Sequence, residues 1–230
     1  MKTIGLLGGM SWESSALYYR LINELVREQR GGLHSARCIM ASLDFADVEA
    51  LQAAGRWDAA GDLLADAALG LEAAGADMIV LCTNTMHKVA GAIEDAVAIP
   101  LVHLADVTAQ AVTAAGLKTV GLLGTAFTME EDFYRDRIAG HGLQVLVPDA
   151  AARALVHRVI YEELVVGVVS EASRSSFLAV IAELAALGAE GVILGCTEIE
   201  LLIDQEATPL PVFATTRLHA EAAVRLALES

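Results

Sequence analysis

The stretch Lys2-Thr-Ile-Gly-Leu-Leu-Gly8 recurs almost unchanged as Lys118-Thr-Val-Gly-Leu-Leu-Gly124, 116 residues further along the chain. A second pair of matching segments, Gly75-Ala-Asp77 and Gly188-Ala-Glu190, follows with a shift of 113 residues. A small drift in the shift is expected if loops have changed length since a duplication. A repeat of this length indicates two similar halves rather than a solenoid of short repeats.

Within each half, short apolar runs alternate with longer helical patterns, which is typical of a parallel sheet with crossover helices. We expect strands at Thr3–Leu7, Ala36–Ser42, Asp77–Leu81, Leu101–Leu104, Thr119–Leu123, Leu143–Val147, Gly191–Leu194 and Val212–Phe213. We expect helices at Trp12–Arg30, Trp57–Ala74, Met86–Ala96, Val107–Ala115, Met129–Ala139, Ala150–Val166, Arg174–Leu187, Thr216–Leu228 and, in a short form, after Thr197. Two Thr-x-x-Glu patterns, at 128–131 and 197–200, are capping boxes that predict helix starts.

The predicted fold class is therefore α/β, with two similar α/β halves whose mainly parallel sheets are related by a pseudo-twofold duplication. We expect the first half at residues 1–105 and the second at residues 106–213. The C-terminal helix, at about 214–230, should pack back onto the first half. An active site in the cleft between the halves is the natural expectation for such a duplication.

Composition narrows the class of protein further. The chain has 15 basic and 30 acidic residues among 230, which disfavours nucleic acid as a partner because nucleic-acid binding needs a basic footprint. No apolar run approaches the ~18 residues of a membrane span. The apolar N-terminal run is short and its copy lies in mid-chain, so it predicts a strand rather than a signal peptide. Three cysteines without framework spacing fit reduced thiols, and we expect a cytoplasmic location.

Two of these cysteines occupy matching places in the repeat. Cys82 ends an apolar run in Met78-Ile-Val-Leu-Cys-Thr-Asn-Thr85, and Cys196 does so in Gly191-Val-Ile-Leu-Gly-Cys-Thr-Glu198. Both lie at a strand-to-helix switch on the carboxyl edge of a sheet, where open α/β folds bind ligands. A helix N-terminus there would attract a carboxylate and lower the pKa of the thiol.

A single cysteine that ends a strand is usually a core residue. Its occurrence at both repeat positions, each time followed by threonine, favours two matched thiols that face one substrate. Cys38 lacks both the turn and a repeat partner, so we interpret it as core.

Other motifs give weaker signals. Gly5-x-x-Gly-Gly9 does not have the Gly-x-Gly-x-x-Gly spacing of a dinucleotide-binding turn. His87 follows Cys82 by five residues, but no Cys-x-x-Cys or His-x-x-x-His spacing supports a metal site, and helix packing or capping is the better interpretation. We therefore expect no cofactor and no metal.

Four motifs carry a resemblance to a known family: Gly8-Gly-Met-Ser-Trp12, Cys82-Thr-Asn-Thr-Met-His87, Ile160-Tyr-Glu-Glu-Leu164 and Gly195-Cys-Thr-Glu-Ile199. On these residues the chain resembles the cofactor-independent aspartate/glutamate racemases over essentially its full length. The resemblance implies an isomerase that interconverts L- and D-amino acids without pyridoxal phosphate or metal, with Cys82 and Cys196 alternating as proton acceptor and donor.

The resemblance also implies a substrate site and a partner. The residues that would bind the dicarboxylic amino acid are Met10, Ser11, Thr83, Asn84, Thr85, Thr197 and Glu198. The threonines and Asn84 would hold the carboxylate, while Glu198 would orient the amino group or the thiol. We expect a small-molecule substrate, a homodimer, and neither nucleic acid nor membrane as partner.

Substrate choice is where the chain departs from the family. In Phe45-Ala-Asp-Val-Glu-Ala-Leu-Gln52 the polar candidate is Gln52, where aspartate-selective relatives can carry a basic side chain for the distal carboxylate. The stretch Glu163-Leu-Val-Val-Gly167 likewise has valine where some relatives carry lysine. Both departures favour a broader substrate range that includes glutamate, although Gln52 could equally be a solvated residue at a helix edge.

Two other functions remain open from the sequence. A maleate-type isomerase also uses two cysteines, and a related decarboxylase keeps only the second. The presence of Cys82 disfavours the decarboxylase, and the Gly8-Gly-Met-Ser-Trp12 opening disfavours both. A non-catalytic amino-acid-binding protein with two α/β halves is the third possibility, but such proteins are usually exported and no signal peptide is recognised.

Overall fold

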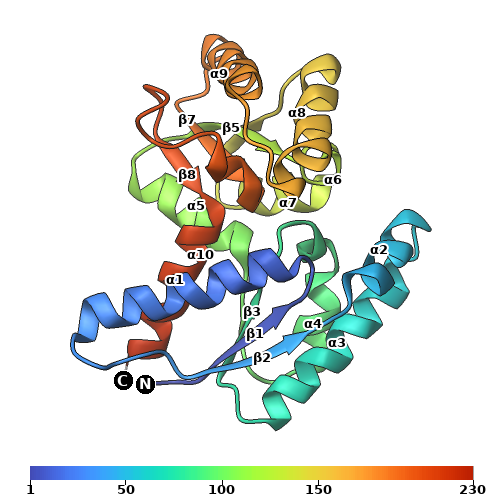
Figure 1. Cartoon of the computed structure of the whole chain (residues 1–230), viewed down its shortest axis with the longest axis vertical. Coiled ribbons are helices and arrows are strands. Elements are labelled where there is room, and N and C mark those ends of the chain that lie inside the picture. Colours follow the sequence, from blue (N-terminus) through green and yellow to red (C-terminus); the bar gives the residue numbers. More distant parts are fainter. Residues whose placement is uncertain (230) are drawn as a thin grey trace. The chain divides into compact units, whose positions relative to one another are not determined.

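The computed structural model describes residues 1–229, which divide into two compact units (Figure 1). The first unit comprises Met1–Leu104 together with the C-terminal segment from His219, and the second comprises Ala105–Leu218. Residue 230, the last of the expected terminal helix, lies outside the described residues. None of the helices in the described part of the chain combines the length and the apolar character needed to cross a lipid bilayer.

The first unit is built on a sheet of four parallel strands in the order β2-β1-β3-β4. Its strands are β1 (Ile4–Gly8), β2 (Cys38–Ser42), β3 (Met78–Leu81) and β4 (Leu101–Val102). The two central strands, β1 and β3, are buried along their whole length. This is the pattern of parallel strands whose two faces are both covered by helices.

The helices of the first unit are α1 (Trp12–Arg30), α2 (Phe45–Ala53), α3 (Trp57–Ala73), the 3-10 turn η1 (Thr85–Val89) and α4 (Ala90–Ala96). From β1 the chain crosses to β2 at one edge of the sheet, and from β2 it crosses back past β1 to β3, in the opposite direction across the sheet. Because parallel crossovers are right-handed, α1 covers one face of the sheet and α3 and α4 cover the opposite face. The pair α3 and α4 lies side by side in Figure 1.

The second unit repeats this arrangement with four parallel strands in the order β6-β5-β7-β8. Its strands are β5 (Thr119–Gly124), β6 (Gln144–Leu146), β7 (Gly191–Gly195) and β8 (Val212–Ala214). Its helices are α5 (Leu104–Ala114), α6 (Ala126–Glu130), α7 (Asp132–Ala139), α8 (Ala150–Glu162), η2 (Leu164–Val166), α9 (Glu171–Ala186) and η3 (Thr197–Leu201), followed by α10 (Thr215–Leu228), which ends in the first unit. The two identical strand orders confirm the predicted α/β fold with two similar halves.

Both predicted capping boxes are wrong. The residue that caps α6 is Thr125, whose hydroxyl accepts from the amide of Thr128, so Thr128 lies inside the helix that it was expected to start. At the second pattern, Cys196 precedes η3 and makes no side-chain cap. The carboxylate of Glu198 instead takes up the hydroxyl of Thr197, which leaves no hydroxyl for the helix amides.

Two predicted helices are shorter than expected, and a third is divided in two. The helix expected at residues 86–96 begins as the 3-10 turn η1, and the one expected at 150–166 ends at Glu162 before η2. The helix expected at 129–139 is two helices, because Glu131 has an extended backbone with ψ 150°. The segment that contains Gln52 forms a helix, α2, which no expected range included.

Candidate active site

The two Cys-Thr turns lie at equivalent positions in the two sheets. Cys82 directly follows β3 and Cys196 directly follows β7, and each of these strands lies beside the first strand of its own sheet. Both turns are therefore at the carboxyl edge of a parallel sheet, the usual ligand-binding edge.

The first half-site is centred on a fully buried thiol. Cys82 has no exposed surface, and its Sγ donates only a weak contact of 3.6 Å to the carbonyl oxygen of Val80. Its backbone is fixed from two sides, since its amide donates to Leu7 and its carbonyl accepts from the Ser14 hydroxyl at 3.0 Å. Burial raises the pKa of the Cys82 thiol far above its usual value.

The turn after Cys82 is largely enclosed. Thr83 and Asn84 are buried, whereas Thr85 is partly exposed and opens η1. The amide of Thr83 already donates to the carbonyl of Leu81 at 2.9 Å. Its hydroxyl, rather than its amide, is thus the group that Thr83 can offer to a substrate carboxylate.

The first loop of the chain lies against the same turn. Gly9 has φ +92°, and an added Cβ would collide with the backbone oxygen of Leu43, so glycine is required there. Ser15 accepts from the amide of Gly9 at 2.8 Å, while Ser11 caps α1 by accepting from the amide of Ser14 at 3.2 Å. Sequence reasoning missed Ser14 and Ser15, although two serines that follow a helix N-cap are a recognisable signal.

The structure places the remaining two predicted residues of this unit near the turn but in different surroundings. Met10 is buried in the apolar core that also contains Met86 from η1. Gln52, in α2, is partly buried, and its Nε2 lies 2.8 Å from the sulfur of Met86. Gln52 therefore contacts η1 through Met86, which follows Cys82 by four residues.

The second half-site surrounds its thiol with acid. Glu198 Oε2 accepts from Cys196 Sγ at 2.8 Å and from Thr197 Oγ1 at 2.6 Å, which brings all three predicted residues of this unit together. Burial raises the pKa of the Cys196 thiol well above its usual value, and the negative charges of Glu198 and Glu200 raise it further. The Glu198 carboxylate is therefore the hydrogen-bond acceptor of the Cys196 thiol.

A second carboxyl group, missed in the sequence, belongs to this half-site. Glu200 lies in η3, and burial, together with the charge of Glu198, raises its pKa to about 7 against the opposing contacts from Thr216 and the opposing charge of Arg217. The isolated Glu-x-Glu spacing in the sequence was the available signal.

The expectation of thiols with lowered pKa values is wrong. The turns that follow the cysteines are 3-10 helices of five residues, too short to develop a strong helix dipole. Desolvation dominates at both sites and raises the pKa of both thiols.

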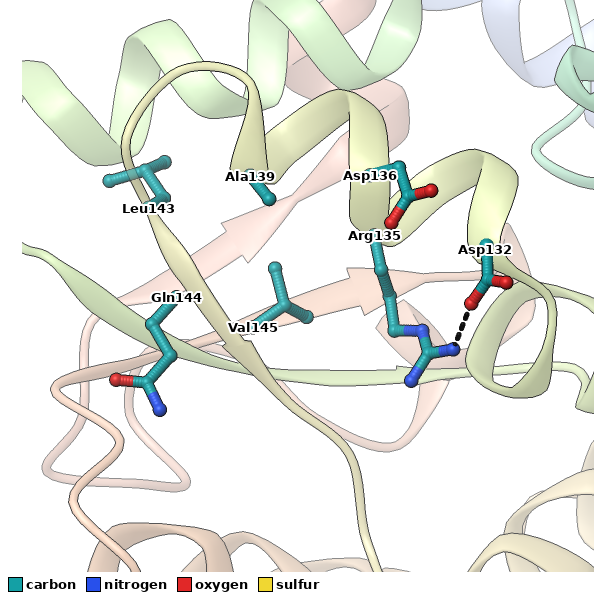
Figure 2. A pocket seen from close by; sticks show the side chains of 7 residues that line it. All are labelled: Asp132, Arg135, Asp136, Ala139, Leu143, Gln144 and Val145. Atoms are coloured by element: carbon teal, nitrogen blue, oxygen red, sulfur yellow. Dashed lines mark hydrogen bonds and ion pairs between the residues drawn. The ribbon is translucent and has the colours of Figure 1, made fainter.

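One surface groove lies away from both cysteines. It has a volume of about 450 Å³ between α7 and β6, and Figure 2 shows its lining residues Asp132, Arg135, Asp136, Ala139, Leu143, Gln144 and Val145. The guanidinium of Arg135 is paired with Asp132. The groove contains no nucleophile and no general base aligned with one, so it is not a candidate for the chemistry.

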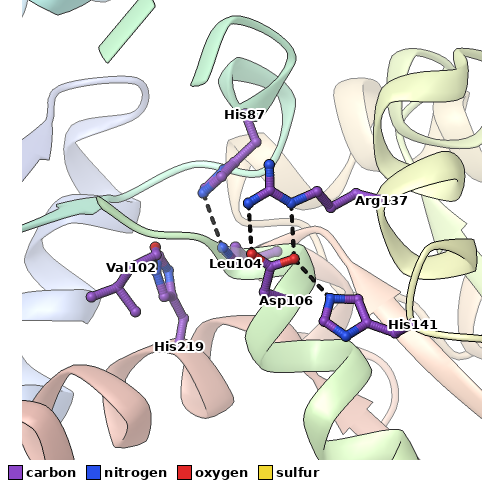
Figure 3. Close-up of polar contacts among 7 residues, drawn as sticks. All are labelled: His87, Val102, Leu104, Asp106, Arg137, His141 and His219. Atoms are coloured by element: carbon purple, nitrogen blue, oxygen red, sulfur yellow. Dashed lines mark hydrogen bonds and ion pairs between the residues drawn. The ribbon is translucent and has the colours of Figure 1, made fainter. Parts of the chain in front are cut away.

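The second unit also contains an ion-pair cluster that holds two helices together. Two nitrogens of the Arg137 guanidinium group, Nε and Nη2, donate to the Asp106 carboxylate at 2.8 and 2.7 Å (Figure 3). His141 Nε2 lies 2.9 Å from the same carboxylate. A bidentate pair of this kind fixes α5 against α7. Among residues 1–229, no group of three or more His, Cys, Asp or Glu side chains has the arrangement of a metal site.

Known structures resemble this chain over its entire length. A candidate Asp/Glu racemase from Yersinia pestis is 52% identical, with a TM-score of 0.96 and full coverage of both chains. An aspartate racemase homologue from Pyrococcus horikoshii OT3 is 34% identical, with a TM-score of 0.90 and full coverage of both chains. The broad specificity amino-acid racemase RacX of Bacillus subtilis strain 168 is 24% identical over 162 residues, 69% of this chain and 68% of that protein.

The match to a described family covers almost the same span as the duplicated fold. Residues 7–223 match the family described as Asp/Glu/Hydantoin racemase. This range includes the Cys82 turn, the Cys196 turn and all eight strands except the first residues of β1. The chain belongs to the Asp/Glu/Hydantoin racemase family.

Proposed function

We propose that this protein is an amino-acid racemase that interconverts L- and D-aspartate, L- and D-glutamate, or both, with Cys82 and Cys196 as its two bases and with neither pyridoxal phosphate nor a metal. The observation that carries the proposal is the repetition of a cysteine, followed by threonine, at the end of β3 and of β7 in two sheets of the same strand order. Inversion at Cα requires an acid and a base on opposite faces of one planar carbanion. A duplicated thiol supplies one group for each face.

The reaction begins at Cys196 in this mechanism. The Cys196 S–H bond points its proton at Glu198 Oε2 over 2.8 Å, and transfer of that proton leaves a thiolate beside a neutral carboxyl group. The thiolate then takes the Cα proton of the substrate, and the electron pair of the C–H bond remains on Cα and spreads into the substrate carboxylate. Hydrogen bonds that strengthen as this charge develops lower the barrier.

Cys82 completes the inversion as the acid. Its thiol is held protonated by burial, so it is ready to donate to the opposite face of Cα. The product then leaves behind a Cys196 thiol, a neutral Glu198 carboxyl group and a Cys82 thiolate, which is the starting state for the reverse direction. The next turnover in the same direction requires the proton held by Glu198 to pass to Cys82 through solvent, which restores the Glu198 carboxylate and both thiols.

The substrate carboxylate is assigned to the polar groups of the two turns. Thr83, Asn84 and Thr85 follow Cys82, and Thr197 follows Cys196. Thr197 already donates to Glu198, so we expect its hydroxyl to exchange that contact for the substrate when the amino acid binds. Ser11 and Met10 belong to the adjoining loop. A homodimer and a cytoplasmic location are part of the same proposal.

Substrate range is assigned to Gln52. Its amide is neutral and already contacts Met86, so it offers no fixed positive charge to a distal carboxylate. Selectivity between aspartate and glutamate should therefore be low. The name of the Bacillus subtilis relative, a broad specificity racemase, is consistent with this proposal.

The test is incubation with L-aspartate and, separately, L-glutamate in D2O, with Cα deuteration followed by NMR and the sign of rotation followed by polarimetry. We expect deuterium at Cα together with loss of optical rotation. Deuteration without loss of rotation would indicate exchange on one face only. Neither change, with binding detected by calorimetry, would identify an amino-acid-binding protein, and conversion of maleate would identify the cis-trans isomerase.

A further inference from the structure

A histidine with no role in the proposed chemistry lies in the Cys82 turn. His87 is 3% exposed and belongs to η1, five residues beyond Cys82. Its Nδ1 lies 2.8 Å from the carbonyl oxygen of Thr83, and its Nε2 lies 3.2 Å from the amide nitrogen of Leu104. The imidazole thus connects Thr83, the residue next to the thiol, to Leu104, the first residue of α5, as Figure 3 shows for the Leu104 contact.

These two partners determine the protonation state of the ring. A carbonyl oxygen can only accept, so Nδ1 carries the proton, and an amide can only donate, so Nε2 has its lone pair free to accept. His87 is therefore the neutral Nδ1–H tautomer. A proton added at Nε2 would face the N–H of Leu104, and both donors would repel each other.

The surroundings reinforce that state. His87 packs against His103 at a ring-centroid distance of 4.7 Å and against His219 at 5.8 Å. His219 is tied in the same way, with Nε2 at 2.6 Å from the Val102 carbonyl and Nδ1 at 2.9 Å from the Tyr18 hydroxyl. All of these residues belong to the first unit.

We propose that His87 is a positioning residue for the reaction assigned above: by linking the Thr83 carbonyl to the Leu104 amide, it fixes the Cys82–Thr85 turn in the geometry that aims the thiol at the substrate. This inference rests on the proposed function only in its catalytic part. The restraint on the turn is a property of the protein with or without substrate. Removal of the restraint should let the Thr83 carbonyl rotate, and the neighbouring thiol should move with it.

The electrostatic surroundings of His87 agree with a permanent neutral role. Burial lowers its pKa well below the usual value, and the nearby imidazoles of His103 and His219 lower it further, against the backbone contacts of Thr83 and Asn84. The groups that face it from the packed elements are His103, His219 and, through His219, the Tyr18 hydroxyl. A general base for the reaction would need the opposite property, since it must accept a proton near working pH.

Two substitutions at this position separate the restraint from packing. His87→Phe keeps a ring in the cavity but removes both hydrogen bonds. His87→Asn keeps an amide N–H at the place of Nδ1, so it retains the bond to Thr83 and loses only the acceptor for Leu104. Tyr18→Phe is the matched control, because it removes the hydrogen bond to His219 in the same cluster and leaves both hydrogen bonds of His87 in place.

The first measurement is alkylation of each cysteine by iodoacetamide, resolved by peptide mass spectrometry, with Cys196 in the same molecule as the internal reference. We expect the ratio of Cys82 to Cys196 labelling rates to rise at least roughly tenfold in His87→Phe and less in His87→Asn, because loop opening exposes a buried thiol. Tyr18→Phe should leave the ratio unchanged. An unchanged ratio in a folded His87→Phe or, if that variant does not fold, in His87→Asn would overturn the proposal.

The second measurement is racemase activity. A misplaced thiol should lower kcat by roughly 100-fold in His87→Phe with a smaller change in KM. His87→Asn should recover a large part of this loss, and Tyr18→Phe should retain the parental kcat. If the parent protein racemises no amino acid, the proposed function fails, but the labelling ratio still decides whether His87 restrains the turn. A kcat loss in Tyr18→Phe equal to that in His87→Phe would show a general packing effect and would contradict the assignment.

Discussion

The Cys82 turn and the Cys196 turn occupy the same place in two sheets of the same strand order, yet the polar groups around them are of opposite kinds. Cys82 has hydroxyl groups and neutral imidazoles near its backbone, and its thiol contacts only a carbonyl. Cys196 donates to the carboxylate of Glu198, with Glu200 close by. The duplication therefore preserved the position of the thiol while the means of handling its proton diverged.

In the proposed mechanism this difference gives the two cysteines unequal roles. The Glu198 carboxylate is placed to take the proton of Cys196, whereas burial holds the Cys82 thiol protonated. The mechanism then starts with the enantiomer whose Cα proton faces Cys196.

The largest effect should follow removal of either thiol. Cys82→Ala and Cys196→Ala should each lower the rate of racemisation by roughly 10²- to 10⁴-fold, because inversion needs an acid on one face and a base on the other. Polarimetry with L-aspartate and L-glutamate measures the loss. Cys38→Ala is the matched control, since Cys38 lies in β2 outside both turns. A single alanine variant that retains more than about a tenth of the parental rate contradicts the two-base assignment.

The variant Glu198→Gln tests whether the Cys196 half-site alone depends on a carboxylate. The amide has nearly the shape of the carboxylate but cannot take the proton of Cys196, so kcat should fall by roughly 100-fold. Deuterium exchange in D2O should fall more for one enantiomer than for the other. Glu190→Gln is the control in the same unit, because Glu190 accepts from the amides of Lys118 and Thr119 and touches neither cysteine. Equal loss for both enantiomers would mean that Glu198 serves both thiols.

A fall in pH should change the free energy of unfolding of the two units in opposite directions. Burial lowers the pKa of His219 from its usual 6.5 to about 4, so between these values the unfolded chain binds a proton that the folded chain refuses. The stability of the first unit is then complete above pH 6.5 and falls by about 3 kcal/mol as the pH approaches 4. Glu200, whose pKa is raised to about 7, has the opposite sign and adds stability as the pH falls from 7 to 4.5.

Amide hydrogen exchange resolved by segment measures this contrast. Between pH 7 and pH 5, after correction for the intrinsic exchange rate, protection should fall in β4 and in α10 from His219 relative to η3 and β7. His219→Gln can keep a donor for Val102 and should reduce the pH dependence in the first unit alone. Parallel changes in both units would mean that these buried groups do not control the pH response.

The smallest effect concerns substrate choice. Gln52→Arg should raise the preference for aspartate over glutamate, measured as the ratio of kcat/KM values, by a charge-assisted contact of about 1–3 kcal/mol at most. Absolute activity can fall while the ratio rises, since the contact of Gln52 with Met86 is also lost. Arg56→Gln, just beyond α2, is a charge-changing control outside the Met86 contact. An unchanged ratio would place Gln52 outside the substrate pocket.

The sequence predicted those features that depend on local pattern. Both end residues of the helix Trp12–Arg30 were predicted correctly. Ser11, its N-cap, precedes the helix and Gly31 follows it, and residues of these types commonly mark helix ends. The positions of Cys82 and Cys196 at strand ends followed from apolar runs of strand length. The extended backbone at Glu131, which divides α6 from α7, left no local signal.

The features that the sequence did not predict depend on tertiary surroundings. The direction of the thiol pKa shifts was wrong, because burial of Cys82 comes from distant segments and outweighs the local dipole. The sequence named the amino group and the thiol as the two groups that Glu198 could orient, and its contact with the Cys196 thiol depends on the 3-10 geometry of η3. The restraint by His87 required Leu104, 17 residues away, to be brought to its ring.

The most direct test of the two-base account is Cα deuterium exchange by the two single variants with each pure enantiomer, without reliance on racemisation. One thiol can remove a proton and return a deuteron on the same face, so Cys82→Ala should exchange only the enantiomer that faces Cys196, and Cys196→Ala only the other. Complementary exchange of this kind would establish one thiol for each face. Exchange of the same enantiomer by both variants, or of both enantiomers by either, would contradict the account.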